Sequence, residues 1–491
     1  MIDKSKILVG YRKYSTLRLY LPADDKDFLS DLYARLAVNR TVTTREAGKL
    51  RRYVEQEPCY SLTKDPRGMP YIVVGYGFLN SIRKLAGKYG YIVEVVRAMP
   101  MGKDFVSRFV PNLKVLDEYA WRDNQRSILE DILTTTHGQY VAATGAGKSY
   151  LILACCRLFP RARILITTYS KTVLRGLHKE LVREGIDAGI SASGVPYREG
   201  RVMLCTVGTL AKMADRVFDF TFLDEKHECA TLSRIHTLQR VNTVRAYALS
   251  ANHNDRRDQA DRWLEAVFGD CRVSANHTDA VKDGDIVPVE VRWLAIPNAK
   301  QTTLAGSHPQ FERVCYWRNQ ERNELAAKYA KKLSDQGQQV LLYVKTVEHA
   351  YQLWRLLKCP VVHSPVTPKD WKARKEREAL PDNIGHIPDK AYMDKIKSEF
   401  ESGELKLVIA NQVWQRGVNF VHLRHLFRLD ASTTQIDATQ VTGRVTRKSE
   451  NKDVGVIWDF LDRFSGSTTR RAARRRAAYA KIGYQQHEFK E

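Results

Sequence analysis

Short apolar runs alternate with amphipathic helical segments through the middle of the chain. Between residues 114 and 285 the apolar runs are 139–143, 164–167, 202–206, 220–224 and 246–250. Runs of four to six such residues are typical of strands that are buried on both faces. Helical segments such as 148–158 and 171–183 separate these runs. Strand–helix alternation predicts a parallel sheet, so we expect an α/β domain here.

The same alternation repeats between residues 286 and 465. Its apolar runs are 289–295, 339–344, 361–363, 407–410, 425–429 and 454–459. This pattern predicts a second α/β domain of similar size. The segment 365–394 interrupts it, is charged and contains four prolines. We interpret this segment as an insertion that is either a strand-separating wedge, a duplex contact or a simple surface excursion.

The two ends of the chain have different patterns. Residues 1–113 mix β-like runs at 71–76 and 91–96 with helix-like runs at 27–36 and 80–89, which predicts a small α+β domain. Residues 466–491 form a tail that opens with GSTTRRAARRRAAYAK, and its alanine spacers favour a helix. The expected domains are therefore 1–113, 114–285, 286–465 and a basic tail at 466–491.

Composition is consistent with several folded domains in a reducing compartment. The chain has 491 residues, of which 43% are hydrophobic, a length that predicts about two to four domains. It has neither a long uncharged apolar stretch nor an apolar run typical of a secretory signal, so we expect no membrane span. Its eight cysteines are scattered without CxxC pairs, which favours reduced thiols and a cytoplasmic protein.

The charge balance indicates a polyanionic partner. Lys and Arg number 79 against 56 Asp and Glu, a formal net charge of +23. Such an excess favours nucleic acid or an anionic membrane surface. Residues 1–113 carry 20 Lys and Arg against 11 Asp and Glu, a net of +9 in under a quarter of the chain.

The segment AATGAGKS (142–149) has the features of a phosphate-binding loop. It follows an apolar run and precedes a helical segment. Gly145 and Gly147 allow backbone N–H groups to face an anion at a helix N-terminus. Lys148 is expected to reach the β- and γ-phosphates, and the Ser149 hydroxyl to ligate Mg²⁺. Ala142 stands where a first glycine is usual, and the alternative is a chance glycine-rich turn.

Two further motifs fit the chemistry of phosphoryl transfer. In FLDEKHE (222–228), Asp224 would end a strand and hold Mg²⁺, while Glu225 would position or deprotonate the attacking water. In QVTGRVTR (440–447), two arginines three residues apart are expected on one side of a helix, where they could stabilise a transferred phosphoryl group. Taken alone, the first motif could be a charged loop after a strand, and the second could be a solvated basic helix.

Together these motifs resemble a superfamily 2 helicase of the DExH type over roughly residues 115–465. The motifs follow the family's order: WRDNQ (121–125) for the Q motif, AATGAGKS for motif I, TTYSKTVLRGL (167–177) for Ia, CTVGTL (205–210) for Ib, DEKH (224–227) for II, LSA (249–251) for III, LLYVKTVEHA (341–350) for IV, IANQVWQRGVN (409–419) for V and QVTGRVTR for VI. Motif Ia has Thr167 where proline is common, and motif V departs from the usual pattern at 415–419.

The resemblance implies two tandem RecA-like parallel-sheet domains with ATP and Mg²⁺ bound between them. The implied nucleotide-binding residues are Arg122, Gln125, Thr144, Gly145, Ala146, Gly147, Lys148 and Ser149. The implied catalytic residues are Lys148, Asp224, Glu225, Gln440, Arg444 and Arg447, with Ser149 and Asp224 at the metal. The implied nucleic-acid contacts are Thr168, Lys171, Thr206, Lys345, Thr346 and Asn411. His227 and Ser250 would couple the two sites, or would only make local hydrogen bonds.

Within the superfamily the layout is similar to phage UvsW-like branch-migration DNA helicases, with RecG and XPB as looser relatives. The similarity lies in the small basic N-terminal domain, the stretch 249–270 and the basic tail. The tail arginines would track phosphates or stay solvated: Arg470, Arg471, Arg474, Arg475 and Arg476. The N-terminal aromatic residues are expected mainly in the core, with stacking on bases as the alternative: Tyr11, Tyr14, Tyr20, Tyr71, Tyr76 and Phe78.

The function predicted from these motifs is an ATP-dependent, monomeric DNA helicase or translocase that acts on forks, junctions or R-loops in replication, recombination or repair. A DExH RNA helicase is an alternative, because the ATPase motifs do not distinguish RNA from DNA. Two further alternatives are a duplex translocase without strand separation and a basic scaffold with an inactive ATPase fold. Nucleic acid replaces the membrane surface as the expected partner.

Overall fold

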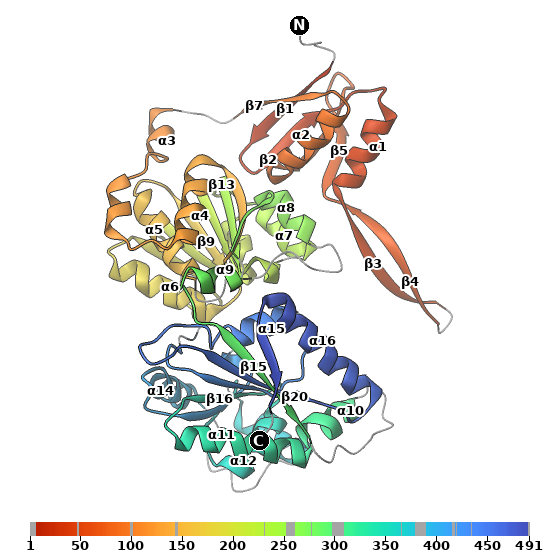
Figure 1. The fold of residues 1–491 in the computed structure, drawn as a ribbon. Coiled ribbons are helices and arrows are strands. Elements are labelled where there is room, and N and C mark those ends of the chain that lie inside the picture. The colour runs from red at the N-terminus through yellow and green to blue at the C-terminus, as the bar shows by residue number, and fades with distance from the viewer. Residues whose placement is uncertain are drawn as a thin grey trace. The chain divides into compact units, whose positions relative to one another are not determined.

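A computed structural model of the chain describes residues 6–46, 49–98, 102–142, 146–229, 231–251, 261–275, 277–296, 309–364, 366–378, 389–414, 418, 420–433 and 435–489. The chain divides into two compact units (Figure 1). The first contains residues 1–142 and 147–275, and the second contains 143–146 and 276–491.

The N-terminal part of the first unit is a five-stranded sheet with two helices packed on one face (Figure 1). The strands run in the order β5-β6-β2-β1-β7, with β1 Ile7–Lys13, β2 Thr16–Tyr20, β5 Tyr60–Lys64, β6 Pro70–Gly75 and β7 Ile92–Arg97. The helices are α1 (Lys26–Arg35) and α2 (Leu79–Lys88). Alternate strand residues such as Leu17 and Leu19 are buried against these helices, because strand side chains alternate between faces.

A long hairpin is inserted between α1 and β5. Its strands are β3 (Ala37–Glu46) and β4 (Lys49–Pro58), and they pair antiparallel over their full length as a two-stranded sheet of their own. Tyr53 and Val54 on β4 are exposed.

The N-terminal sheet is packed tightly against the rest of the first unit. The buried Arg12 guanidinium donates to the backbone carbonyl of Val244 and lies 3.7 Å from the Tyr76 ring centroid. A methyl group added at Gly75 would overlap the backbone of Ala266, so glycine is required by this close approach. The contacts explain why the small domain and the first parallel sheet form one unit.

The rest of the first unit is a seven-stranded, all-parallel sheet with the order β10-β11-β9-β12-β13-β8-β14. Its strands are β8 His137–Ala142, β9 Ile164–Thr168, β10 Ala188–Ser191, β11 Val202–Thr206, β12 Val217–Asp224, β13 Asn242–Ser250 and β14 Cys271–Ala275. Its helices are α3 Lys103–Ser107, α4 Asp123–Thr134, α5 Lys148–Leu158, α6 Lys171–Arg183, α7 Leu232–Gln239 and α8 Asp261–Phe268.

The second unit contains another seven-stranded parallel sheet, with the order β17-β18-β16-β19-β20-β15-β21. Its strands are β15 Val289–Ala295, β16 Val340–Tyr343, β17 Val361–Val362, β18 Leu407–Ala410, β19 His425–Arg428, β20 Gly455–Leu461 and β21 Gln485–Glu488. Its helices are α9 His277–Lys282, α10 Pro309–Glu312, α11 Gln320–Asp335, α12 Val347–Leu357, α13 Pro368–Glu378, α14 Lys390–Glu401, α15 Gln435–Thr442 and α16 Gly466–Ile482.

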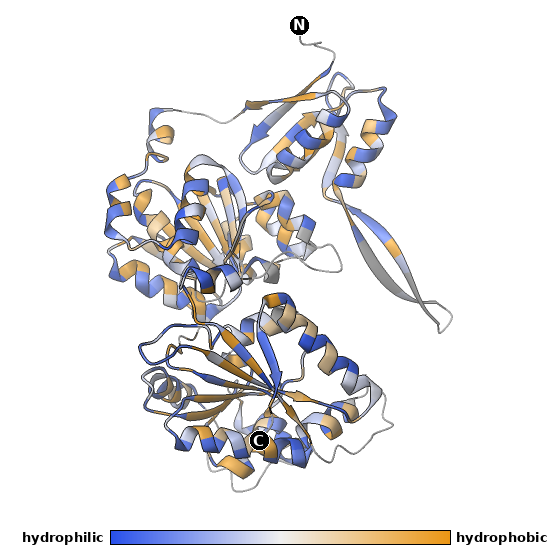
Figure 2. Cartoon of the chain, in the orientation of Figure 1, coloured by the Kyte–Doolittle hydropathy of each residue, from blue (hydrophilic) through white to orange (hydrophobic). Residues whose placement is uncertain are grey.

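The predicted fold class is confirmed by these two parallel sheets, the small α+β domain and the helical tail. Most strands of both parallel sheets are buried along their length, as expected where both faces are covered, and many of their residues are hydrophobic (Figure 2). No helix among the described residues is both long enough and apolar enough to span a membrane.

The C-terminal segment is part of the second parallel sheet rather than a separate solvated tail. Helix α16 begins with a capping box at Ser465 and ends at Gly483, whose φ of 92° suits glycine. Strand β21 then pairs in parallel with β15 at the edge of the sheet. The helix buries one face, which consists of Thr468, Ala472, Arg475 and Tyr479. This spacing of three and four residues is the period of a helix packed on a core.

Arg475 is the residue that most clearly departs from the prediction. It was predicted as a phosphate contact, but its side chain is fully buried. Its guanidinium lies 3.1 Å from Asp459 Oδ1 and 2.8 Å from Asp462 Oδ2. Burying an arginine is tolerated where carboxylates pair with it, and here they lie on and just after β20. Arg475 is therefore removed from the predicted nucleic-acid contacts.

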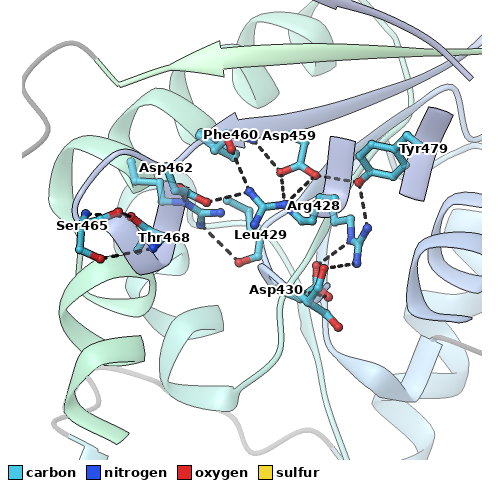
Figure 3. Close-up of polar contacts among 12 residues, drawn as sticks. Arg428, Leu429, Asp430, Asp459, Phe460, Asp462, Ser465, Thr468 and Tyr479 are labelled. Atoms are coloured by element: carbon cyan, nitrogen blue, oxygen red, sulfur yellow. Dashed lines mark hydrogen bonds and ion pairs between the residues drawn. The ribbon is translucent and has the colours of Figure 1, made fainter. Parts of the chain in front are cut away.

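The buried charges continue to both sides of Arg475. Asp459 also accepts a hydrogen bond from the Tyr479 hydroxyl, and that hydroxyl accepts one from Arg428 (Figure 3). Asp462 pairs with Arg322 of α11 at 3.0 Å, and both side chains are fully buried. Together with the Arg428–Asp430 pair, these contacts form the arginine–aspartate network, whose members are Arg322, Arg428, Asp430, Asp459, Asp462, Arg475 and Tyr479.

The described parts of the predicted insertion, 366–378 and 389–394, are helical over most of their length. Helix α13 is anchored by Trp371, which is buried and stacks on His363 with a 5.7 Å centroid distance and a 12° interplanar angle. Trp371 also contacts Tyr351 of α12 edge-on. The first half of the insertion therefore packs on the domain core, which excludes a simple surface excursion for α13.

Candidate functional site

The turn between β8 and α5 has the geometry of an anion-binding helix start. Gly147 precedes the helix with φ 81° and ψ 33°, a left-handed conformation that favours glycine. Gly147 stands at the N-cap of α5. Because it has no side chain, it cannot cap the backbone N–H groups of the first turn. A helix start of this kind suits a phosphate. Thr144 and Gly145, which were predicted to bind phosphate, lie outside the described residues.

The Q motif and motif I are in contact. Gln125 is buried in the first turn of α4, where its Oε1 accepts a hydrogen bond from the Arg122 backbone N–H at 3.2 Å. A methyl group on Gly147 would overlap the Gln125 amide nitrogen. Thus Gly147 is required both by its backbone conformation and by the packing of Gln125. Arg122 and Gln125, predicted together, are brought to the phosphate-loop helix.

Motif I and motif II also meet. Lys148 Nζ lies 3.9 Å from Glu225 Oε1 and donates to the Ala142 carbonyl at 3.3 Å. Asp224 is buried at the end of β12, and Glu225 follows it with φ 57°. Positive φ is uncommon for residues other than glycine and is frequent where strain serves a site. The structure therefore places the predicted lysine beside one of the two predicted carboxylates.

A buried lysine that sequence reasoning did not select joins β12 to the phosphate-loop strand. Lys226 is 1% exposed and donates to Gln139 Oε1 of β8 at 2.9 Å. Gln139 Nε2 in turn donates to the Gly269 carbonyl at 2.6 Å. The only signal in the sequence is a polar residue inside an otherwise apolar strand. This chain of hydrogen bonds fixes the segment that carries Asp224 and Glu225.

Motif III ends the strand between β12 and β8. Ser250 is fully buried at the end of β13, which pairs with both neighbours. The side chain of His227, its predicted coupling partner, lies outside what the structure describes.

An aromatic group that was not predicted lies beside the Q motif. Tyr150 of α5 contacts Tyr119 and Trp121 with centroid distances of 4.8 and 6.1 Å. Tyr119 also receives the Arg157 guanidinium at 5.5 Å. The only hint in the sequence is that Tyr119 and Trp121 stand just before the charged residues of the Q motif.

The predicted nucleic-acid contacts of the first unit lie along one edge of its sheet. Thr168 ends β9 and Thr206 ends β11, and the two residues are partners in the parallel ladder. Lys171 is exposed in the first turn of α6. Because all strands are parallel, these residues share the carboxyl edge with Asp224 and Ser250. The side chains of Thr168 and Thr206 are buried. Of these three predicted contacts, Lys171 is the one that is exposed, and it is a cation.

In the second unit, motif VI differs from the predicted helix. Helix α15 ends at Thr442, so Arg444 and Arg447 lie in the turn after it. Both guanidiniums donate to the backbone carbonyl of Val418 in motif V, at 3.0 and 2.9 Å. A helix would have aligned these side chains by spacing, whereas here a shared acceptor aligns them. Gln440 is buried within α15. Residues 415–417 and 419 of motif V lie outside the described residues.

A buried lysine follows motif VI and is expected to make stability depend on pH. Burial, together with the charges of Arg447 and Arg424, lowers the pKa of Lys452 to about 7. In the unfolded chain a lysine has a pKa of about 10.4. Between these values the unfolded chain holds a proton that the folded chain has lost. The free energy of unfolding should therefore rise with pH, by up to about 1.4 kcal/mol per pH unit.

Replacing Lys452 with methionine should remove that rise. Urea midpoints of parent and variant, compared from pH 6 to pH 9, measure the effect, and below pH 7 the contribution should level off because both states are protonated. Equal pH profiles for the two proteins would contradict a buried, neutral lysine.

The other predicted contacts of the second unit also lie at a carboxyl edge. Lys345 and Thr346 follow β16, and Asn411 follows its neighbour β18. Thr346 caps α12 by accepting from the His349 N–H, and Lys345 pairs with Glu312 at 3.2 Å. On α16, Arg470 and Arg474 are exposed, whereas Arg471 pairs with Glu312 at 3.2 Å.

Family comparison matches the helicase conserved C-terminal domain to residues 322–449. This range begins in α11 and ends just after motif VI, so it covers the second sheet's central strands β16, β18 and β19. Residues 322–449 therefore carry a helicase conserved C-terminal domain.

The chain is similar to the ATP-dependent DNA helicase uvsW of Enterobacteria phage T4, at 22% identity over 246 residues. The alignment covers 50% of this chain and 45% of the phage protein, so it spans about half the length of that relative. The crystal structure of T4 UvsW matches 98% of both chains at 15% identity and a TM-score of 0.41.

Two solved structures show the same fold. Dbp5 of S. cerevisiae, bound to RNA and ADP BeF3, matches with a TM-score of 0.53 at 12% identity, over 79% of this chain and 94% of Dbp5. Mss116p bound to ssRNA and AMP-PNP matches with a TM-score of 0.53 at 11% identity, over 80% of this chain and 78% of Mss116p.

Proposed function

We propose that this chain is an ATP-dependent DNA motor that unwinds or remodels branched DNA, such as forks, junctions and R-loops, in replication, recombination or repair. The observation that carries the proposal is the 3.9 Å approach of Lys148 Nζ to Glu225, which joins the phosphate loop to the motif II carboxylates. The sequence relation to a phage DNA helicase favours DNA as the polymer.

ATP and Mg²⁺ are the proposed cofactors. Lys148 would bind the β- and γ-phosphates, and the α5 N-terminus would add N–H donors. The Ser149 hydroxyl and the Asp224 carboxylate supply the hard oxygen ligands that suit Mg²⁺. When bound, the metal neutralises phosphate charge. Glu225 would orient the attacking water and accept its proton.

The second domain would complete the ATPase. Arg444 and Arg447 are the proposed transition-state cations, and burial lowers the pKa of Arg447 only to about 10, so its guanidinium stays charged at neutral pH. We propose 114–285 as the ATP-binding domain, 286–465 as the C-terminal helicase domain, 1–113 as a nucleic-acid-binding domain and 466–491 as a basic segment that packs on the second parallel sheet. We propose a monomeric motor in the cytoplasm.

Nucleic-acid specificity is tested by ATP turnover and strand separation on a panel of polymers. We expect forked DNA and four-way junctions to stimulate turnover more than RNA duplexes, and expect the forks to be unwound. The Lys148→Ala protein serves as the control for contaminating ATPase. Stimulation by RNA alone would make the protein an RNA helicase, and stimulation by duplex DNA without unwinding would make it a translocase.

A further inference from the structure

The face of the N-terminal sheet opposite α1 and α2 is open around Tyr11 and Val96, whereas α8 contacts it near Gly75 through Ala266. Helices α1 and α2 bury Leu8, Leu17, Leu19, Ile72 and Val74 on the other face. Residues between these positions on the same strands are exposed or half-buried. Side chains alternate along a strand, so these residues lie together on the open face. Tyr11 is 42% exposed there, and its ladder partner Val96 is 48% exposed.

Three tyrosines and one arginine are neighbours on this open face. Tyr11 of β1 lies opposite Arg18 of β2, and Tyr20 of β2 lies opposite Tyr71 of β6. The rings of Tyr11 and Tyr20 are 6.0 Å apart, and those of Tyr20 and Tyr71 are 5.4 Å apart. The Arg18 guanidinium lies 4.7 Å from the Tyr71 centroid. We call Tyr11, Arg18, Tyr20 and Tyr71 the tyrosine platform.

The open face of the sheet carries more cations than acids. The open face carries Lys13 and Arg18, and Glu94 is its only acid among the strand residues, all of which the structure describes. The open face is thus both aromatic and cationic.

From this arrangement we infer that the tyrosine platform binds the unpaired bases of a single nucleic-acid strand. Aromatic rings on an open sheet stack successive bases of a single strand, and arginine planes stack in the same way. Bases inside a duplex have no free face to offer, so the site selects unpaired strands. The inference rests on the proposed function and deepens it, because it assigns the N-terminal domain to the single-stranded arm of a branched substrate.

The structure also separates the platform from the aromatic residues that serve packing. Phe78 is fully buried in the core of the small domain, and Tyr76 receives Arg12 at the contact with the first parallel sheet. Replacing these two would damage the fold. Tyr11 has no such role and can be changed without opening a core.

The platform is tested with the full-length chain and a fluorescent 15-nucleotide oligothymidine, with binding followed by anisotropy. Replacing Tyr11 and Tyr71 together with leucine should weaken binding about 25-fold or more, because each lost stacking contact weakens binding about fivefold or more. The Tyr11→Phe protein keeps the ring and should bind like the parent. Tyr197→Leu, which removes an exposed tyrosine elsewhere in the first unit, should also bind like the parent.

Two further arms separate the outcomes. A blunt 15-base-pair duplex should bind the parent and the leucine variant equally, and a loss on both probes would mean a general defect that overturns the platform. A bromodeoxyuridine oligomer should crosslink the parent protein at Tyr11, Tyr20 or Tyr71, and crosslinks confined to other segments would also overturn it. A parallel oligouridine probe shows whether the platform accepts RNA bases as well.

Failure of the platform can be told from failure of the proposed function. If branched DNA stimulates ATP turnover but the leucine variant binds the single strand like the parent, only the platform is refuted. If no nucleic acid stimulates turnover in the parent, the proposed function fails whatever the oligomer binding shows.

Discussion

ATP turnover should fall by about 10²–10³-fold when Lys148 is replaced by alanine, the loss typical of removing a preorganised donor to a reacting phosphate. Lys148 is the side chain that links the phosphate loop to Glu225 and to the Ala142 carbonyl. Replacing Glu225 with glutamine should cost a similar factor, because an amide cannot accept the proton from water. Steady-state phosphate release in the presence of saturating forked DNA measures both effects.

The controls for these two variants are two adjacent residues on helix α6 of the same unit. Lys179→Ala and Glu180→Gln change exposed residues of α6 in the same chemical way and should leave turnover within about twofold, as surface substitutions are nearly neutral. Binding of DNA without nucleotide should persist in all four proteins. Normal turnover in either site variant would remove that residue from the catalytic set.

The second large effect is expected from Arg475→Ala, which should destabilise the second unit by about 3–5 kcal/mol, the range for breaking a buried ion pair. The variant would leave Asp459 and Asp462 buried without their shared cation. Tyr479 and Arg322 keep one contact each to these carboxylates, but they do not replace the lost charge. The urea midpoint of the transition reported by Trp293 and Trp458 fluorescence measures the effect.

Arg474→Ala is the matched control, one residue away on the exposed side of α16. Its unfolding midpoint should stay close to that of the parent, within about 0.5 kcal/mol. If Arg474 contacts a phosphate, the salt slope of DNA binding should fall by about one. Equal stability of the two variants would contradict a structural role for Arg475.

The burial of Arg475 also changes what deletion of the C-terminal segment would test. Removing residues 466–491 would take away α16 and the edge strand β21, along with the arginine–aspartate network's contacts to Asp459 and Asp462. Such a deletion is expected to unfold the second unit, so weaker DNA binding would not report on phosphate contacts. Point variants at exposed arginines avoid this problem.

Local patterns were enough to predict the two parallel sheets and to place motifs I and II after strands. Unbroken apolar runs must be buried on both faces, and parallel strands bring their carboxyl ends to one edge. Lys148 and Glu225 therefore share one edge of the sheet, and the strand order, with β13 alone between β8 and β12, brings them within 3.9 Å. The helix predicted for Arg444 and Arg447 was wrong, because spacing alone does not show that both would donate to Val418.

The residue pattern of the chain was enough to give the order of motifs, to predict the fold class and to name candidate side chains for binding phosphate and Mg²⁺. Tertiary structure alone decided which basic and aromatic residues face solvent. Arg474 and Arg475 are adjacent and chemically identical, yet only Arg475 meets two carboxylates from another part of the chain. Likewise, Tyr11 and Phe78 looked alike as core candidates until the sheet placed them on opposite sides. The free energy of burying a charge or a ring depends on partners distant in sequence, and only the folded chain brings those partners together.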